Sequence, residues 1–185
     1  MALKATIHKA ELQLSDLDRH HYGTYSLTLA RHPSETDERM MVRLLAFALY
    51  ASEHLSFCKG ISDEDEPDLW EIDLGGNLER WIEVGLPDEK RVRKACGRAR
   101  QVVVITYSGR TADMWWQQNQ AALAKQDKLT VLQLPAAQSQ ALAALAERTM
   151  NLTCTLQEGQ IWLSSGARDM QLEPLYLQRQ TQGAP

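Results

Sequence analysis

The feature that most constrains the fold of this chain is the run of β-branched residues at 102–106. Because polar and apolar residues do not alternate in this run, we predict an interior strand that is covered on both faces. Pro87 and Asp88 open a helix before it, with a buried stripe of Val92, Ala95, Cys96 and Ala99. Another helix is expected at about 111–125. A buried strand between helices indicates an α/β fold, with a mixed central β-sheet flanked by helices.

The rest of the chain predicts further strands and helices around this centre. Alternating residues at 4–14 and 22–30 predict an N-terminal β-hairpin that extends or closes one side of the sheet. Residues 33–37 predict a helix start with Ser34 as its cap, paired with Asp37. Strands are expected at 68–74 and 81–84, antiparallel around Gly75-Gly76-Asn77, and at 129–134. A helix at 136–148 and a hairpin of residues 152–156 and 161–163 complete the prediction.

Length and composition favour one globular domain. The chain has 185 residues, of which 44% are hydrophobic, so a single core needs no disulfide or metal. We assign residues 1–180 to this domain and expect a disordered tail at 181–185. The longest apolar run, residues 44–51, is far shorter than the ~20 residues that a membrane helix needs.

The expected compartment is the cytoplasm. Lys4, His8 and Lys9 stand where a signal peptide is apolar, so we expect no membrane association. The three cysteines are far apart and include no CxxC pair, which favours reduced thiols: Cys58, Cys96 and Cys154. The net charge of −4 argues against a broadly basic nucleic-acid coat protein but permits a local basic patch.

Two acids occupy neighbouring predicted strands. Asp68 follows Pro67 at the start of one strand, and Glu83 lies inside the next. The order helix, strand with an early acid, strand with an interior acid, helix, strand is that of the PD-(D/E)xK phosphodiesterases, the restriction-endonuclease-like fold. Mg²⁺ prefers oxygen ligands and commonly takes one or two carboxylates. We therefore expect Asp68 and Glu83 to share Mg²⁺ or Mn²⁺, and nucleic acid to be the partner.

Longer segments of the chain resemble the YaeQ family of bacterial proteins. The matching segments are residues 1–7, residues 27–41 (LTLARHPSETDERMM), residues 81–96 (WIEVGLPDEKRVRKAC) and residues 115–120 (WWQQNQ). The resemblance extends to about residue 163. It implies a fold similar to the PD-(D/E)xK nucleases and carries no established activity. In nucleases of this fold a carboxylate from the first helix often joins the site, which makes Glu38 the third candidate.

Each acid also has a purely structural interpretation. Asp68 can cap a turn after Pro67, and Glu38 can stabilise a helix N-terminus by its charge. Glu83 can pair with a basic residue, since an unpaired carboxylate between Ile82 and Val84 is costly to bury.

The lysine of the PD-(D/E)xK motif is missing, because Gly85 stands two residues after Glu83. Alternation along a strand places that position on the same face as the acid, where an ammonium positions the attacking water. Lys90 in the following helix is the candidate replacement, although it lies opposite the apolar stripe of that helix. Arg91, Arg93 and Lys94 give the same helix a basic face, which either contacts phosphates or is simply solvated.

Trp115 and Trp116 are the remaining candidates for nucleic-acid binding. Consecutive helical residues point about 100° apart, so one side chain packs in the core and the other is free to stack on a base. Core packing of both is the simpler alternative. The histidines show no metal-binding spacing.

Two classes of function follow. The first is a metal-dependent nuclease, or a protein descended from one. The second is a catalytically degenerate binding or adaptor module that keeps the nuclease scaffold. A protein partner for the acidic loop at residues 63–66 is a third, weaker hypothesis.

Overall fold

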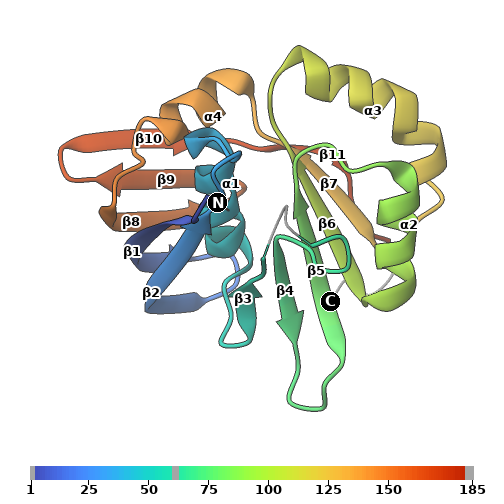
Figure 1. The fold of residues 1–185 in the computed structure, drawn as a ribbon, viewed down its shortest axis with the longest axis horizontal. Coiled ribbons are helices and arrows are strands. Elements are labelled where there is room, and N and C mark those ends of the chain that lie inside the picture. The colour runs from blue at the N-terminus through green and yellow to red at the C-terminus, as the bar shows by residue number, and fades with distance from the viewer. Residues whose placement is uncertain (1–2, 60–62, 182–185) are drawn as a thin grey trace.

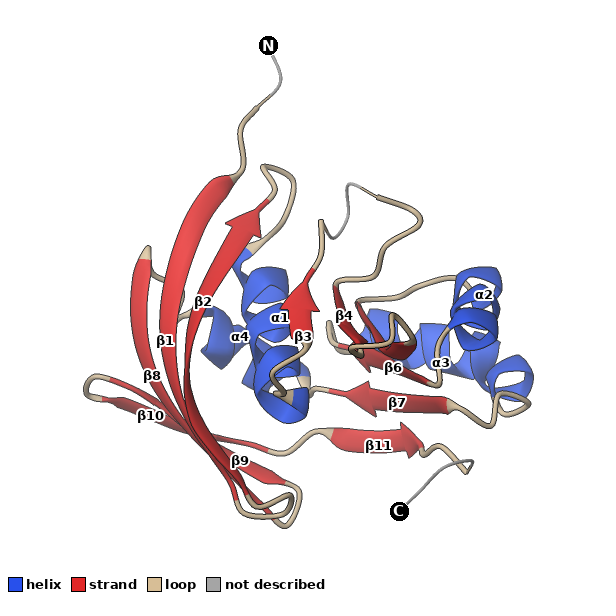
Figure 2. Ribbon diagram, turned by 90° about the horizontal axis from the view of Figure 1, so that it is seen from below, coloured by secondary structure: helices blue, strands red, loops and turns tan. Residues whose placement is uncertain are grey.

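The computed structural model describes residues 3–59 and 63–181 and contains two β-sheets. The five-stranded sheet has the order β10-β9-β8-β1-β2 and the six-stranded sheet the order β11-β7-β6-β5-β4-β3. Figure 2 shows four layers: the five-stranded sheet, helices α1 and α4, the six-stranded sheet, and helices α2 and α3. Both sheets are mixed, because each contains parallel and antiparallel neighbours.

The elements run along the chain as coloured in Figure 1. They are β1 (Thr6–Asp16), β2 (His21–Arg31), α1 (Asp37–Tyr50), β3 (Leu55–Phe57), β4 (Leu69–Ile72), β5 (Leu78–Val84), α2 (Glu89–Arg98), β6 (Gln101–Thr106), α3 (Arg110–Leu123), β7 (Leu129–Gln133), α4 (Ala136–Ala143), β8 (Thr149–Gln157), β9 (Gln160–Ser165), β10 (Arg168–Leu172) and β11 (Leu175–Gln178).

Strand β6 confirms the prediction from its β-branched run. It pairs in parallel with β5 and β7, and residues 102–106 are all buried. Val103 and Ile105 face a core shared with α1, whereas Val102 and Val104 face a second core under α2 and α3. A strand needs apolar residues at every position when both of its faces are covered.

The prediction of a single central sheet was wrong. The N-terminal hairpin forms as predicted, with β1 antiparallel to β2, but it belongs to a separate sheet because β1 also pairs in parallel with β8. Leu12 lies opposite Leu152 in that pairing. The two strands are far apart in the sequence, so local alternation predicts each strand but not their pairing.

Helix α1 lies between the two sheets and begins later than predicted. Thr36, not Ser34, is its cap, and the hydroxyl of Thr36 accepts a hydrogen bond from the Arg39 N–H at 3.1 Å. All residues from Met40 to Ala48 are buried, because this helix packs against strands on two sides. The predicted hairpin β4–β5 and the terminal hairpin β8–β9 are confirmed, whereas α4 ends at Ala143 rather than at Arg148. The short strands β3, β10 and β11 were not predicted.

Candidate functional site

Asp68 and Glu83 lie side by side at one end of the β4–β5 ladder. Leu69 pairs with Ile82 in this antiparallel ladder, and the Asp68 N–H donates to the Ile82 carbonyl at 3.1 Å. Both carboxylates line one cavity of about 260 Å³. They are 2% and 6% exposed, respectively. The two acids predicted to share a site therefore face the same small space.

The Asp68 carboxylate joins helix α1 to the end of strand β5. Its Oδ1 accepts a hydrogen bond from Arg39 Nη2 at 2.8 Å, and its Oδ2 accepts one from the Val84 N–H at 2.7 Å. Arg39 stands in the first turn of α1 and also donates to the Val84 carbonyl at 3.1 Å. Asp68 thus has a structural role whether or not it also binds a metal.

The Glu83 carboxylate is held by one of its two oxygens. Oε1 accepts hydrogen bonds from Trp81 Nε1 at 2.8 Å and from Arg91 Nε at 2.7 Å. Within the part of the chain that the structure describes, Oε2 accepts no hydrogen bond. Burial raises the pKa of Glu83, and the negative charge of Asp68 raises it further, against the opposing effect of Arg91.

A second buried ion pair supports this arrangement from helix α1. Arg43 donates to Glu35 through Nε at 2.7 Å and through Nη2 at 2.8 Å, and both side chains are almost fully buried. Arg39 Nη1 also reaches Glu35 Oε1 at 3.0 Å. Sequence reasoning missed Glu35, Arg39 and Arg43. The available signal was Arg43, a charge between Val42 and Leu44 on the most apolar stretch of the helix, since buried charges are normally paired.

Glu38 lies apart from these acids. Its Oε1 accepts a hydrogen bond from the Ser139 hydroxyl at 2.6 Å, which ties α1 to α4. Glu38 is not among the residues that line the cavity of Asp68 and Glu83. The structure therefore brings two of the three candidate acids together.

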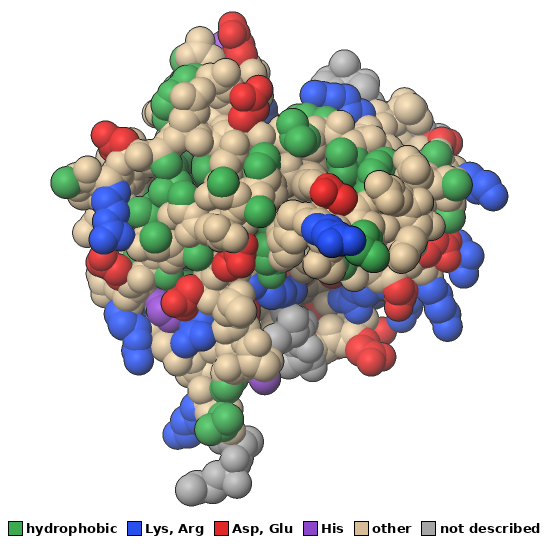
Figure 3. All heavy atoms as spheres, turned by 90° about the horizontal axis from the view of Figure 1, so that it is seen from above, with side chains coloured by type: hydrophobic (Ala, Val, Ile, Leu, Met, Phe, Trp, Pro, Cys, Tyr) green, Lys and Arg blue, Asp and Glu red, His purple; other side chains and the backbone are tan. Residues whose placement is uncertain are grey.

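The basic face of α2 is largely paired with the acidic loop that precedes β4. Arg91 donates to the carbonyls of Glu64 and Glu66 at 2.7 and 2.8 Å, and Lys94 Nζ lies 2.9 Å from Asp65 Oδ1. Arg93 reaches Glu89 on its own helix at 3.3 Å. Basic and acidic side chains are interspersed along the right-hand edge of the molecule in Figure 3. The helix thus offers fewer unpaired positive charges than its sequence suggested.

Two basic residues differ in their relation to the cavity. Lys90 is exposed and does not line it, whereas Arg91 lines it and contacts Glu83. Gly85 follows β5 with a φ of 115°, a backbone conformation that L side chains rarely adopt. A lysine at that position would therefore be strained.

Trp115 and Trp116 separate as the helical geometry predicts. Trp115 is buried in the core under α2 and α3, and its Nε1 donates to the Pro87 carbonyl at 2.7 Å. Trp116 is half-buried and lines a shallow cavity with Gln120 and Leu177. Trp115 therefore positions the loop before α2, while Trp116 is accessible.

The donor set at Asp68 and Glu83 suits a small hard cation such as Mg²⁺. Both candidate ligands are carboxylates, and Glu83 Oε2 has no hydrogen-bond donor among the described residues. In residues 3–59 and 63–181 no cluster of three or more His, Cys, Asp or Glu side chains could hold a metal ion. A magnesium site here would therefore use two protein carboxylates, with water and substrate as the remaining ligands.

Comparisons with known proteins find relatives that match most of the chain. A family model described as YaeQ protein matches residues 1–174. Proteins named "Uncharacterized protein YaeQ" from Salmonella typhi and Escherichia coli (strain K12) are each 48% identical to the chain. The alignments cover 94% of this chain and 96% of the first protein, and 93% of this chain and 95% of the second.

Two solved structures also match nearly the whole chain. The crystal structure of YaeQ protein from Xanthomonas axonopodis pv. citri has a TM-score of 0.91 and 47% identity, covering 94% of this chain and 98% of that chain. The YaeQ protein from Pseudomonas syringae has a TM-score of 0.89 and 33% identity, covering 96% of this chain and 98% of that chain. In the described parts of this chain, none of the helices is long and apolar enough to cross a membrane.

Proposed function

The chain belongs to the YaeQ family, and we propose that it is a metal-dependent phosphodiesterase that acts on nucleic acid, with Asp68 and Glu83 at its reaction centre. One observation carries the proposal: two buried carboxylates on neighbouring strands line a single cavity of about 260 Å³. Burial and the charge of Asp68 raise the pKa of Glu83, and carboxylates perturbed in this way are common at functional sites, since they are costly to keep without a role.

The order of elements around the acids supports a restriction-endonuclease-like core. Helix α1 precedes the antiparallel strands β3, β4 and β5, and α2 then leads to β6, which runs parallel to β5. Asp68 directly precedes β4, and Glu83 is the penultimate residue of β5. This is the order of helix, acid-bearing strands, helix and strand that characterises the PD-(D/E)xK core.

In the proposed site Asp68 and Glu83 hold Mg²⁺ or Mn²⁺. When bound, the ion would neutralise charge on a phosphodiester oxygen and lower the pKa of a bound water. Arg39 holds Asp68 in place, and Trp81 fixes one oxygen of Glu83. The other Glu83 oxygen faces no donor from the described residues and is the one available for the ion.

Arg91 replaces Lys90 as our candidate for the missing lysine. Its guanidinium reaches Glu83 and lines the cavity, so it is close enough to contact a phosphate. A guanidinium stays protonated at all working pH values and therefore orients a phosphate or water rather than moving a proton. Glu38 is left with a structural role beside Ser139.

The test is a cleavage assay on labelled single- and double-stranded DNA and RNA with Mg²⁺ or Mn²⁺. We expect metal-dependent products that disappear in Asp68→Ala and Glu83→Ala and persist in Lys90→Ala. Cleavage that persists in both of these acid variants would contradict the assignment of the site to Asp68 and Glu83.

A second candidate is a nucleic-acid-binding or adaptor protein without catalysis. The observation that favours it is the pairing of each acid with a guanidinium, Asp68 with Arg39 and Glu83 with Arg91, together with glycine at the motif lysine. Two neutralised carboxylates attract a cation less strongly than two free ones. This candidate predicts no cleavage with any metal and no calorimetric signal for Mn²⁺ binding.

A further inference from the structure

A cavity outside the acidic site lies between the two sheets. It has a volume of about 470 Å³ and lies where Tyr50 at the end of α1, Arg80 of β5 and Tyr176 of β11 face one another. Its apolar lining comes from helix α1 and from both sheets, and it includes Leu49, Val103, Leu132, Leu156 and Ile161. Ligand sites commonly have volumes of roughly 300–1,000 Å³, an apolar lining and a few polar groups.

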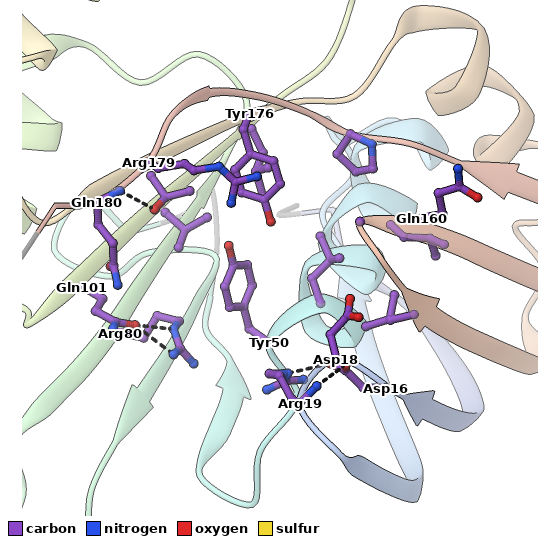
Figure 4. A pocket seen from close by; sticks show the side chains of 18 residues that line it. Asp16, Asp18, Arg19, Tyr50, Arg80, Gln101, Gln160, Tyr176, Arg179 and Gln180 are labelled. Carbon is purple, nitrogen blue, oxygen red and sulfur yellow. Dashed lines mark hydrogen bonds and ion pairs between the residues drawn. The ribbon is translucent and has the colours of Figure 1, made fainter. Parts of the chain in front are cut away.

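Two tyrosines point toward each other across this cavity (Figure 4). Each has an arginine near the face of its ring: Arg80 lies 5.0 Å from the Tyr50 ring centroid, and Arg179 lies 3.5 Å from that of Tyr176. An arginine stacked in this way is held in place by the aromatic ring. The cavity is thus bordered by two aromatic rings, each stacked with an arginine.

Most of the charges around the cavity are already paired. Asp16 accepts from Arg19 at 2.6 Å, and Arg80 reaches Glu71 at 2.7 Å and Gln101 at 2.9 Å. A ligand that bound through these groups would have to break existing hydrogen bonds.

Several polar groups of the lining have no hydrogen-bond partner among the described residues, and two of them matter here. Among the described residues, Arg179 makes no hydrogen bond or ion pair through its guanidinium, and the Tyr50 hydroxyl makes no hydrogen bond. Burial raises the pKa of Tyr50, so this hydroxyl stays protonated and can donate. Both unpartnered groups are hydrogen-bond donors, and one of them carries a positive charge.

We propose that this cavity binds a small organic anion, a molecule with a flat apolar body and one acidic group. The body lies between the tyrosines on the aliphatic lining. The acidic group accepts hydrogen bonds from Arg179 at the mouth and from the Tyr50 hydroxyl inside. Arg179 is the cation of the lining that has no ion pair among the described residues, so a neutral ligand leaves its guanidinium unused. Asp18 also lines the cavity and, within the described part of the chain, accepts only the Glu158 N–H, so its carboxylate disfavours a second acidic group on the ligand.

The cavity is separate from the acidic site. Arg39 of the acidic site stands in the first turn of α1, and Tyr50 is the last residue of that helix. Eleven residues of helix correspond to roughly 16 Å along its axis at about 1.5 Å per residue. No lining residue is common to the two cavities. Binding here does not depend on the proposed nuclease function.

The experiment compares two probes with the same aromatic body. 8-Anilinonaphthalene-1-sulfonate carries one anionic group, and N-phenyl-1-naphthylamine carries none. Fluorescence titration of the full chain should give saturable binding of the anionic probe and at least tenfold weaker binding of the neutral one. Arg179→Met should weaken the anionic probe about tenfold and leave the neutral probe unchanged, since a bidentate ionic contact is lost. Tyr50→Phe should weaken the anionic probe several-fold.

Matched controls separate this site from others. Arg148→Met removes another exposed arginine, whose side chain lies outside the cavity, and should leave binding unchanged. Glu83→Gln should also leave it unchanged, which separates this inference from the nuclease proposal. The absence of saturable binding, equal affinity for both probes, or insensitivity to Arg179→Met would each overturn the inference. Loss of binding in Glu83→Gln would overturn it as well, because the probe would then occupy the acidic cavity. Circular dichroism of each variant verifies its fold. Because Arg179 is exposed, Arg179→Met still tests the inference if Tyr50→Phe does not fold.

Discussion

Replacing Asp68 with alanine should cost stability independently of any effect on activity. The Asp68 carboxylate is 2% exposed and accepts hydrogen bonds from the Val84 N–H at 2.7 Å and from Arg39 at 2.8 Å. Loss of an acceptor for a buried N–H costs about 1–3 kcal/mol. Loss of one partner of a buried ion pair costs roughly 3–5 kcal/mol. This is an upper value here, because Arg39 still pairs with Glu35 when Asp68 is removed.

Because the ion-pair figure is an upper value and both losses concern the same carboxylate, we take about 3–5 kcal/mol as the total cost of Asp68→Ala. In a chain of this length each kcal/mol shifts the melting temperature by roughly 2–4 °C, which gives a decrease of about 6–20 °C. Urea denaturation and differential scanning calorimetry measure both quantities.

The matched control is Asp65→Ala, which removes an exposed acid that pairs with Lys94 across the same region. It should leave the denaturation midpoint unchanged, because exposed ion pairs contribute little. If Asp68→Ala unfolded at the wild-type midpoint, Asp68 would not stabilise the contact between α1 and β5.

Three further predictions follow from the same contacts. Folding raises the pKa of Glu83 above its ordinary value of 4.5, so the carboxylate binds a proton more tightly in the folded protein than in the unfolded chain. Wild-type stability relative to Glu83→Gln should therefore fall as the pH rises from 4.5 through the folded-state pKa, and a pH-independent difference would contradict this. Arg91→Ala should speed cleavage of the acidic loop by a glutamate-specific protease, whereas Lys90→Ala should not, because only Arg91 bonds to the carbonyls of Glu64 and Glu66. Burial raises the pKa of the thiols of Cys58, Cys96 and Cys154 to about 12, 11 and 12, respectively. Ellman's reagent at pH 8 should therefore react slowly with the native protein and fully after unfolding. Rapid labelling of the native protein would contradict the burial of Cys96 and Cys154 and the half-buried placement of Cys58.

The sequence was sufficient to predict the structure where a local pattern of residues determines it. Residues 102–106 predict β6 because a strand buried on both faces needs apolar side chains at every position. Gly75-Gly76-Asn77 predicts the β4–β5 reversal, which in turn places Asp68 beside Glu83. These are short-range features that the chain encodes within a few residues.

The second sheet could not be predicted in this way. It depends on β1 pairing with β8, strands at opposite ends of the chain, and alternation alone does not specify the partner of a strand. Likewise, the spacing of charges along α2 predicts a basic face but not its pairing with the acidic loop. Arg39 and Glu35 were missed because their roles depend on how α1 packs against the end of β5.

The direct test of Asp68 and Glu83 as a reaction centre is the rate of metal-dependent cleavage in a matched pair of strand β5 variants. Glu83 and Glu79 lie on the same strand, but only Glu83 lines the acidic cavity. With Mn²⁺ and a labelled oligonucleotide, Glu83→Gln should lower the rate by roughly 100-fold or more, since even outer partners of a metal site are worth about 10- to 100-fold. Glu79→Gln should retain the wild-type rate. Cleavage by Glu83→Gln at the wild-type rate, or no cleavage by the wild-type protein with any metal, would contradict the assignment of Asp68 and Glu83 as the reaction centre.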